Sequence, residues 1–188
     1  MEDFISRLMS EERKKWQNPE KIVELAGIKE GMHVADIGSG PGFFTVPIAR
    51  KVGMKGVVYA VEKERGMIVY LKKRIKQEGL EKTVRIVNLP AERTSLASSS
   101  IDLVFMANVF HDINDHKALL KELNRILKDN GTVVNIDWKK RFTSQGPPSQ
   151  LRISMKEEVS IFERSGFRLV KRIKVGPYHY GFVLAKQP

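Results

Sequence analysis

Acidic and glycine residues gather at the ends of two predicted β-strands in the first third of the chain. The stretch from Asp36 to Gly42 reads Asp-Ile-Gly-Ser-Gly-Pro-Gly and joins a β-rich run, residues 32–38, to a helical pattern over residues 42–52. Glycine lets the main chain turn sharply and approach a ligand closely. In open α/β sheets, ligands bind where a strand ends and the next helix begins. The stretch therefore predicts a ligand-binding turn.

A second acid, Glu62, ends the next β-rich run, roughly 20 residues after the turn, where a carboxylate can accept both hydroxyls of a ribose. In the dinucleotide fingerprint Gly-x-Gly-x-x-Gly, the third glycine would fall where this chain has Phe43. Neither Gly-Lys-Ser nor Gly-Lys-Thr follows, so the spacing also differs from that of a phosphate-binding P-loop. We expect a nucleoside-containing cofactor.

Short β-rich runs alternate with helical patterns along the chain. Strands are predicted over residues 32–38, 56–62, 83–88, 101–107, 131–137, 167–175 and 180–186. Helices are predicted over residues 18–28, 42–52, 64–79, 115–131 and 154–166. Pro47 is compatible with its helix only in the first turn or at a kink, and Asn130 with Gly131 should stop the fourth helix. The alternation predicts an α/β fold with a mostly parallel sheet and an antiparallel pair of strands at one edge.

These features together resemble class I S-adenosylmethionine-dependent methyltransferases: Asp-x-Gly-x-Gly-x-Gly after the first strand, an acid closing the second, and a helix-strand-strand tail. The segment 105–138 resembles the branch that includes ubiquinone/menaquinone and arsenite methyltransferases and many small-molecule enzymes. The resemblance covers about residues 19–186. It implies a Rossmann-like seven-stranded, mostly parallel sheet with helices on both faces and an antiparallel edge strand. It also implies S-adenosylmethionine as the cofactor.

The resemblance places the cofactor against the ends of the first four strands. Asp36 would orient the glycine turn and the amino group of the cofactor, and Glu62 would hold the ribose. Many relatives have Gly-Asp-Ala-Glu after strand three, whereas this chain has Leu-Pro-Ala-Glu, with Pro90 in place of the acid. The adenine would then be bound by the Ala91 backbone amide and by the Glu92 carboxylate. The alternative for Glu92 is that it is a solvated acidic residue of the loop without a role in binding. The implied cofactor-binding residues are Asp36, Gly38, Ser39, Gly40, Gly42, Glu62, Lys63, Ala91, Glu92 and Ala107.

Chemistry on the methyl acceptor is expected just after the fourth strand. The resemblance puts His111 and Asp112 at the rim where an acceptor would lie. An imidazole is a suitable base for a phenol, enol or amine, so both residues are predicted to be catalytic. A structural or helix-capping histidine is the alternative. Asp137 and Trp138 could line the acceptor pocket, and core positions are the alternative for them.

Methyl transfer requires that water be excluded, and two segments are candidates for a lid. One is the loop over residues 139–150, and the other is the N-terminal segment 1–17, which could equally be a helix packed on the sheet. In that segment Phe4, Leu8 and Met9 share one face if it is helical. Arg7 and Arg13 are then available to a carboxylate.

Composition narrows the class of partner. The length of 188 residues predicts one domain. The resemblance implies that this is a single S-adenosylmethionine-binding methyltransferase domain over 1–188, and we expect a monomer or homodimer. No apolar run approaches the roughly 20 residues that span a bilayer, and the start is acidic where a signal peptide is basic, so we expect a cytoplasmic protein without a membrane partner.

The absence of cysteine disfavours metal sites. It also argues against arsenite as the acceptor, because the arsenite methyltransferases that the chain resembles depend on cysteine thiols. No Asn-Pro-Pro-Tyr or similar run follows strand four, which disfavours methylation of base nitrogens. The net charge of +11 favours an anionic small molecule as methyl acceptor first. RNA is the second possibility, and a non-catalytic nucleoside-binding module is the third.

Overall fold

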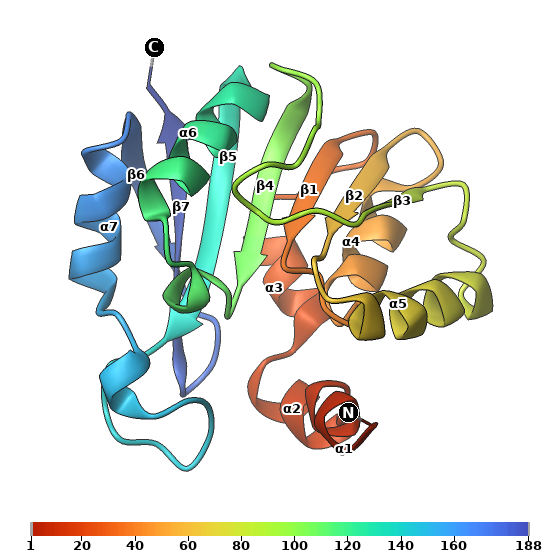
Figure 1. Ribbon diagram of the computed structural model, residues 1–188, viewed down its shortest axis with the longest axis horizontal. Coiled ribbons are helices and arrows are strands. Elements are labelled where there is room, and N and C mark those ends of the chain that lie inside the picture. The colour runs from red at the N-terminus through yellow and green to blue at the C-terminus, as the bar shows by residue number, and fades with distance from the viewer. Residues whose placement is uncertain (1, 188) are drawn as a thin grey trace.

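The computed structural model describes residues 2–187, so Met1 and Pro188 of the predicted domain lie outside it. These residues form one seven-stranded sheet in the order β3-β2-β1-β4-β5-β7-β6 (Figure 1). The strands are β1 His33–Ile37, β2 Val57–Val61, β3 Val84–Val87, β4 Ile101–Ala107, β5 Leu127–Trp138, β6 Phe167–Ile173 and β7 His179–Lys186. β7 runs antiparallel to both of its neighbours, β5 and β6, whereas the other pairs are parallel. The predicted α/β fold is confirmed, with the opposed strand one place in from the edge.

Helices cover both faces of the sheet. On one face pack α3 Pro19–Leu25, α4 Thr45–Val52 and α5 Arg65–Gln77, and on the other α6 His116–Ile126 and α7 Met155–Glu163. Side chains alternate along the strands: Phe105 of β4 faces the first layer, and Val104 and Met106 face the second. Both layers are almost completely shielded from solvent, as expected for a parallel sheet covered on both sides.

Local sequence explains where the first long elements begin. Asn18 caps α3 by accepting a hydrogen bond from the Lys21 backbone N–H at 2.9 Å, and Pro19 is the first helical residue. Pro47 lies in the first turn of α4, where a helix lacks intrahelical partners for its N–H groups in any case. The helix therefore accommodates Pro47 in its first turn, as the sequence predicts.

The fourth predicted helix ends earlier than expected. α6 stops at Ile126, and Leu127 is already extended and paired with Ile101 of β4. The apolar spacing of a helix continues through Leu127, but this side chain is fully buried in the sheet layer, so pairing overrides the pattern. The predicted extension to Asn130 is wrong, and β5 begins at Leu127.

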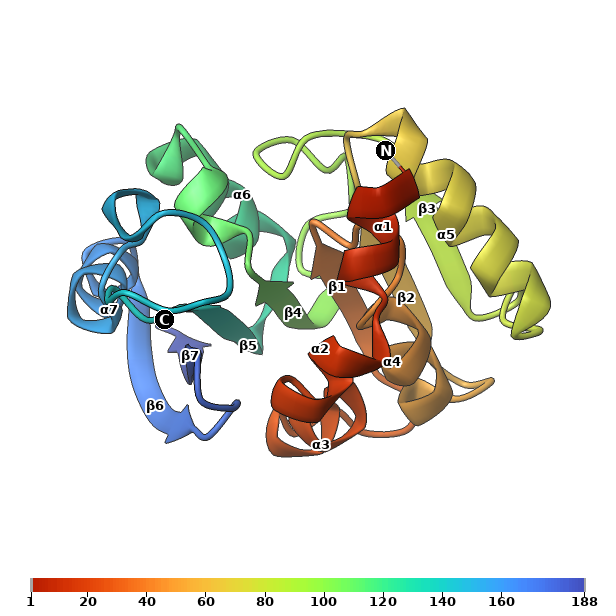
Figure 2. The same ribbon diagram turned by 90° about the horizontal axis from the view of Figure 1, so that it is seen from below.

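The carboxyl ends of the parallel strands converge at the lower end of the molecule in Figure 1. Two short N-terminal helices, α1 Glu2–Leu8 and α2 Glu11–Trp16, lie at this end, and Figure 2 shows α1 crossing the ends of β1 and β2. The short 3-10 helices η1 Phe110–Asp112 and η2 Ser149–Leu151 follow β4 and the loop after β5. Within residues 2–187, no helix is long and apolar enough to cross a bilayer.

Candidate functional site

The glycine turn after β1 is tied to the end of β2. The backbone N–H groups of Gly38 and Ser39 donate to the Val61 carbonyl at 2.9 and 3.1 Å. Gly40 N–H donates to Glu62 Oε2 at 2.8 Å, and Glu64 N–H donates to Glu62 Oε1 at 2.8 Å. Two backbone donors therefore fix the Glu62 carboxylate beside the turn.

Gly40 shows that the turn can accommodate a ligand. It has a φ of +53°, and a Cβ placed on it would meet no protein atom within 4 Å. Any side chain here would project into open space beside the main chain, which is the space that a closely approaching ligand needs. The turn therefore leaves room for a ligand beside its main chain at Gly40.

Asp36 lies beneath the turn and is almost completely buried. Its Oδ2 accepts a hydrogen bond from Thr45 Oγ1 at 2.6 Å, and its residue is 3% exposed. Burial raises the pKa of the Asp36 carboxyl to about 7; the Thr45 hydrogen bond opposes this rise and the charge of Glu62 adds to it. At neutral pH the Asp36 carboxyl is therefore close to the midpoint of its ionisation.

A cavity of about 410 Å³ opens over these groups. Of the residues predicted to be functional, those lining it are Asp36, Gly38, Ser39, Gly40, Glu62, Lys63, Ala107 and Asp112. The remaining wall comes from α1, α2, the first turns after β1 and β4, and α5, through Phe4, Leu8, Arg13, Pro41, Phe43, Phe44, Glu64, Met67, Asn108, Val109 and Ile113. The structure therefore brings most of the predicted cofactor residues to one cavity.

Three predicted cofactor residues lie outside that lining. A Cβ on Gly42 would come within 2.7 Å of Leu71 Cδ1, so this glycine allows α5 to pack against the turn. Ala91 packs against the apolar layer under α6, and Glu92 is half-buried in the loop after β3. Asn88 of the same loop donates to the Glu62 carbonyl at 2.9 Å and helps to hold the end of β2.

A second cavity of about 430 Å³ adjoins the first. The two share the lining residues Phe4, Leu8, Arg13, Asn108 and Asp112. The second cavity adds Arg7, Trp16, His111, Trp138, Gln145, Gly146 and Pro147. Both predicted lids therefore contribute to it, the N-terminal helices on one side and the loop after β5 on the other.

His111 contacts the second cavity and is held by Asp137 at the end of β5. His111 Nδ1 lies 2.7 Å from Asp137 Oδ1, and the His111 backbone N–H donates to Asp137 Oδ2 at 3.1 Å. His111 Nε2 lies 3.5 Å from Asp112 Oδ1. Burial lowers the pKa of His111, but the hydrogen bond and charge of Asp137, with that of Asp112, outweigh it and raise the pKa above 6.5. When the ring is neutral and Nδ1 donates to Asp137, Nε2 carries the lone pair.

A second buried carboxyl, that of Glu158, lies behind this pair. Glu158 of α7 is fully buried and accepts a hydrogen bond from Asn135 Nδ2 at 2.5 Å. Burial and the charge of Asp137 raise the pKa of Glu158 well above its usual range, so it is protonated at neutral pH. Asp137 accepts a further hydrogen bond from the Trp138 backbone N–H at 2.7 Å.

Aromatic rings form one wall of the second cavity. The Trp16 and Trp138 ring centroids are 5.9 Å apart, and His179 of β7 lies 5.6 Å from the first and 4.0 Å from the second. Burial, with the charges of Arg13 and other nearby basic groups, lowers the pKa of His179 to about 3, so this ring is neutral. Neither of its ring nitrogens has a hydrogen-bond partner within residues 2–187.

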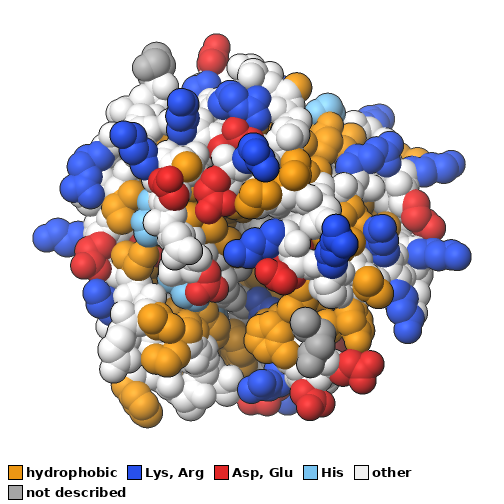
Figure 3. All heavy atoms as spheres, viewed as in Figure 1, with side chains coloured by type: hydrophobic (Ala, Val, Ile, Leu, Met, Phe, Trp, Pro, Cys, Tyr) orange, Lys and Arg blue, Asp and Glu red, His pale blue; other side chains and the backbone are white. Residues whose placement is uncertain are grey.

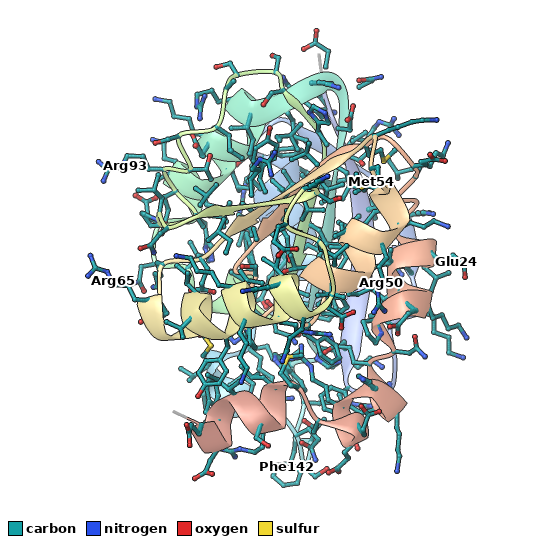
Figure 4. All side chains as sticks on the ribbon, turned by 90° about the vertical axis from the view of Figure 1, so that its right-hand side faces the viewer. Glu24, Arg50, Met54, Arg65, Arg93 and Phe142 are labelled. Carbon is teal, nitrogen blue, oxygen red and sulfur yellow. The ribbon has the colours of Figure 1, made fainter. Side chains whose placement is uncertain are left out.

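Arg152 organises the loop after β5, and sequence reasoning missed it. This buried guanidinium donates to the carbonyls of Lys139, Arg141, Gln145 and Pro147 and to Thr143 Oγ1. It also lies 5.4 Å from the Trp138 ring centroid. The loop is therefore held as a fixed wall, and its exposed Phe142 lies at the same end of the molecule as α1 and α2 (Figure 4). A lone arginine after a polar loop gives no sequence signal for this role.

Positive charge does not gather into one patch on the face seen in Figure 3. There, Lys and Arg side chains are spread over the surface, with Asp and Glu side chains among them. Hydrophobic side chains surround a hollow towards the lower end of this view, where the strands end.

Comparisons with known proteins identify the family. The family described as "Methyltransferase domain" matches residues 35–135. The ubiquinone/menaquinone biosynthesis C-methyltransferase UbiE of Idiomarina loihiensis is 26% identical over 118 residues, which are 63% of this chain and 47% of that protein. The chain thus spans about half the length of the curated relatives it matches.

Solved structures extend the match over the whole fold. A SAM dependent methyltransferase from Aquifex aeolicus has a TM-score of 0.92 and 32% identity, covering 98% of this chain and 97% of that one. A putative type 11 methyltransferase from Sulfolobus solfataricus has a TM-score of 0.74 and 28% identity, covering 92% and 94%. The predicted family and Rossmann-like fold are confirmed, and with them S-adenosylmethionine as the cofactor of the family. The chain belongs to the methyltransferase domain family, with the fold of class I S-adenosylmethionine-dependent methyltransferases.

Proposed function

We propose that this protein binds S-adenosylmethionine in the first cavity and transfers its methyl group to a small acceptor in the second. The observation that carries the proposal is the pair of adjoining cavities with five shared lining residues, one containing the glycine turn and Glu62 and the other His111. Positioning two reactants side by side can supply roughly 7–11 kcal/mol of the barrier. When bound, the cofactor supplies a methyl group already activated by its sulfonium.

Different residues of the first cavity would bind different parts of the cofactor. Glu62 would accept hydrogen bonds from the ribose hydroxyls, since each carboxylate oxygen retains a lone pair beside its backbone donor. The backbone around Gly40 would border the methionine end. Asp36, with its pKa raised to about 7, would become ionised beside the positive charges of the cofactor. Lys63 and Met67 line the part of the cavity near β2 and α5 and would border adenine.

His111 is the general base of the proposal. Asp137 orients the ring by accepting from Nδ1, which leaves Nε2 to take a proton from an acceptor hydroxyl, enol or amine. Asp112, also predicted to be catalytic, has a largely exposed side chain 3.5 Å from Nε2, where its charge would stabilise the protonated ring. Phe4, Leu8 and the loop after β5 would exclude water from the site.

The chemistry of the second cavity supports a small organic acceptor. Its size falls in the range of cavities that bind small molecules. The Trp16 and Trp138 rings favour an acceptor with an apolar, planar part. The curated relatives are C-methyltransferases of quinone biosynthesis, which is compatible with an acceptor that must lose an O–H proton for carbon or oxygen to be methylated.

Methylation assays with labelled S-adenosylmethionine and a panel of phenols, enols and amines test the proposal. Activity should rise with pH through an inflection above pH 6.5, because only the neutral His111 ring can accept a proton. His111→Gln should lower kcat about 100- to 10,000-fold and remove the inflection. His33→Gln, at the far end of β1, is the matched control and should behave like the wild type. Full turnover by His111→Gln would rule out this base.

RNA remains the alternative acceptor class because of the net charge of +11. Binding to phosphates weakens steeply as salt is added. RNA that binds with this salt dependence and becomes methylated, while no small molecule does, would contradict the proposed acceptor. Absence of S-adenosylmethionine binding at millimolar concentration would leave only a module without methyl transfer.

A further inference from the structure

Arg13 is a buried cation without a counter-ion. Its residue is 8% exposed, yet no carboxylate within residues 2–187 forms an ion pair with its guanidinium. Burying a charge without a partner carries a large desolvation penalty, and that burial lowers the pKa of Arg13 to about 10. An arginine in this situation is expected to find its counter-ion in something that binds.

The guanidinium is fixed in place but not saturated. Its carbon lies 3.9 Å from the Phe43 ring centroid, so the plane of the group is held against an aromatic face. Nε donates to Gln17 Oε1 at 3.0 Å, and one Nη1 hydrogen is taken by the Leu8 carbonyl at 2.8 Å. Within the described chain, Nη2 has no hydrogen bond. Since a guanidinium carries five N–H donors, three of them remain for a ligand.

Arg13 lies where a ligand in either cavity could contact it. It lines both cavities at the boundary between them. Arg7, the other arginine that the sequence makes available to a carboxylate, is exposed and lines only the second cavity. A ligand in either cavity can therefore reach Arg13. A planar carboxylate can accept two parallel hydrogen bonds from the remaining N–H donors of the guanidinium.

We propose that Arg13 binds the carboxylate of a ligand at the junction of the two cavities. The carboxylate has two possible sources, the amino-acid end of the cofactor and the acceptor itself. The inference rests on the proposed function for the identity of the cavities. In either case the ligand would supply the missing counter-ion and join α1 and α2 to the glycine turn through one charged group.

Calorimetry tests the first source. Wild-type protein should bind S-adenosylmethionine roughly 10- to 100-fold more tightly than decarboxylated S-adenosylmethionine, which lacks only the carboxylate. Arg13→Gln should reduce this preference to about threefold or less. Lys15→Gln, which removes one exposed charge from the same helix, is the matched control and should keep the wild-type preference. Arg13→Lys retains the positive charge but cannot form paired hydrogen bonds to a carboxylate, so an intermediate preference is expected. This variant replaces Arg13→Gln in the test if circular dichroism shows that Arg13→Gln does not fold.

Tryptophan fluorescence tests the second source. The chain has two tryptophans, Trp16 and Trp138, and both line the second cavity, so quenching reports its occupancy. With S-adenosylhomocysteine present, 4-hydroxybenzoate should bind more tightly than 4-hydroxybenzamide if the acceptor supplies the carboxylate, and Arg13→Gln should remove the difference.

The outcomes are separable. Loss of the first preference in the Arg13 variants assigns the carboxylate to the cofactor, and loss of the second alone assigns it to the acceptor. If neither preference depends on Arg13, or if Lys15→Gln alters them equally, the proposal is wrong. Failure of the wild type to bind S-adenosylmethionine at all would instead overturn the proposed function.

Discussion

Asp36 should make the ligand-free protein less stable as pH rises, and Asp36→Asn should remove this effect. Burial places the folded-state pKa at about 7, against an ordinary value of 3.8. Folding therefore favours the protonated carboxyl, and stability falls as the pH rises from about 4 through 7. A shift of about 3 units at about 1.4 kcal/mol each gives ~4 kcal/mol as the largest cost of the buried charge.

The expected gain for Asp36→Asn at pH 8 is about 2–4 kcal/mol in the free energy of unfolding, because relaxation around the charge recovers part of the cost. The asparagine carbonyl can still accept the Thr45 hydroxyl. Urea unfolding followed by circular dichroism at several pH values between about 4 and 8 measures the gain. The gain in the free energy of unfolding should nearly vanish at about pH 4, where the Asp36 carboxyl is protonated in the folded protein.

Asp102 provides a control of opposite sign. It is partly buried, but hydrogen bonds from Lys128 Nζ and the His33 backbone N–H lower its pKa. Asp102→Asn should therefore lose stability at pH 8, and this loss should shrink only below the ordinary pKa of aspartate, as the pH falls through the lowered pKa of Asp102. A stability difference between Asp36→Asn and the wild type that does not change with pH would refute the reasoning about Asp36.

Three other substitutions test separate parts of the structure. Glu62→Gln should weaken S-adenosylmethionine binding by about 1.5–3 kcal/mol in calorimetry, because a charged acceptor for the ribose is lost; equal affinity would show that the ribose lies elsewhere. Gly42→Ala should lower the free energy of urea unfolding by about 1–3 kcal/mol, since its Cβ would overlap Leu71, and no loss would mean that α5 can move away. Arg152→Met should speed proteolysis within residues 139–148, because it releases five hydrogen bonds to that loop; an unchanged cleavage rate would contradict its role.

Local sequence signals were sufficient for the fold and for locating the glycine turn that borders the first cavity. The alternation of strands and helices follows from hydrophobic periodicity, and the turn from Asp36 to Gly42 is a contiguous motif. The end of α6 was wrong because Leu127 suits both a helical stripe and a buried strand, and only pairing with Ile101 decides between them. Such pairing depends on residues distant in the sequence.

The second cavity shows what contiguous sequence patterns leave out. His111 was singled out because it follows a predicted strand, but its contact with Asp137 joins η1 to the end of β5. The raised pKa of Glu158 depends on its burial between α7 and the sheet, and the unpaired charge of Arg13 depends on how α2 packs. Spacing in the sequence carries none of these relations, because each arises when separate elements pack together.

The most direct test of the account is a crystal structure grown with S-adenosylhomocysteine. The account predicts a ligand in the first cavity, with its ribose hydroxyls on Glu62 and its amino-acid end beside the main chain at Gly40. Ligand density elsewhere, or a cavity that stays empty at saturating ligand, would contradict it.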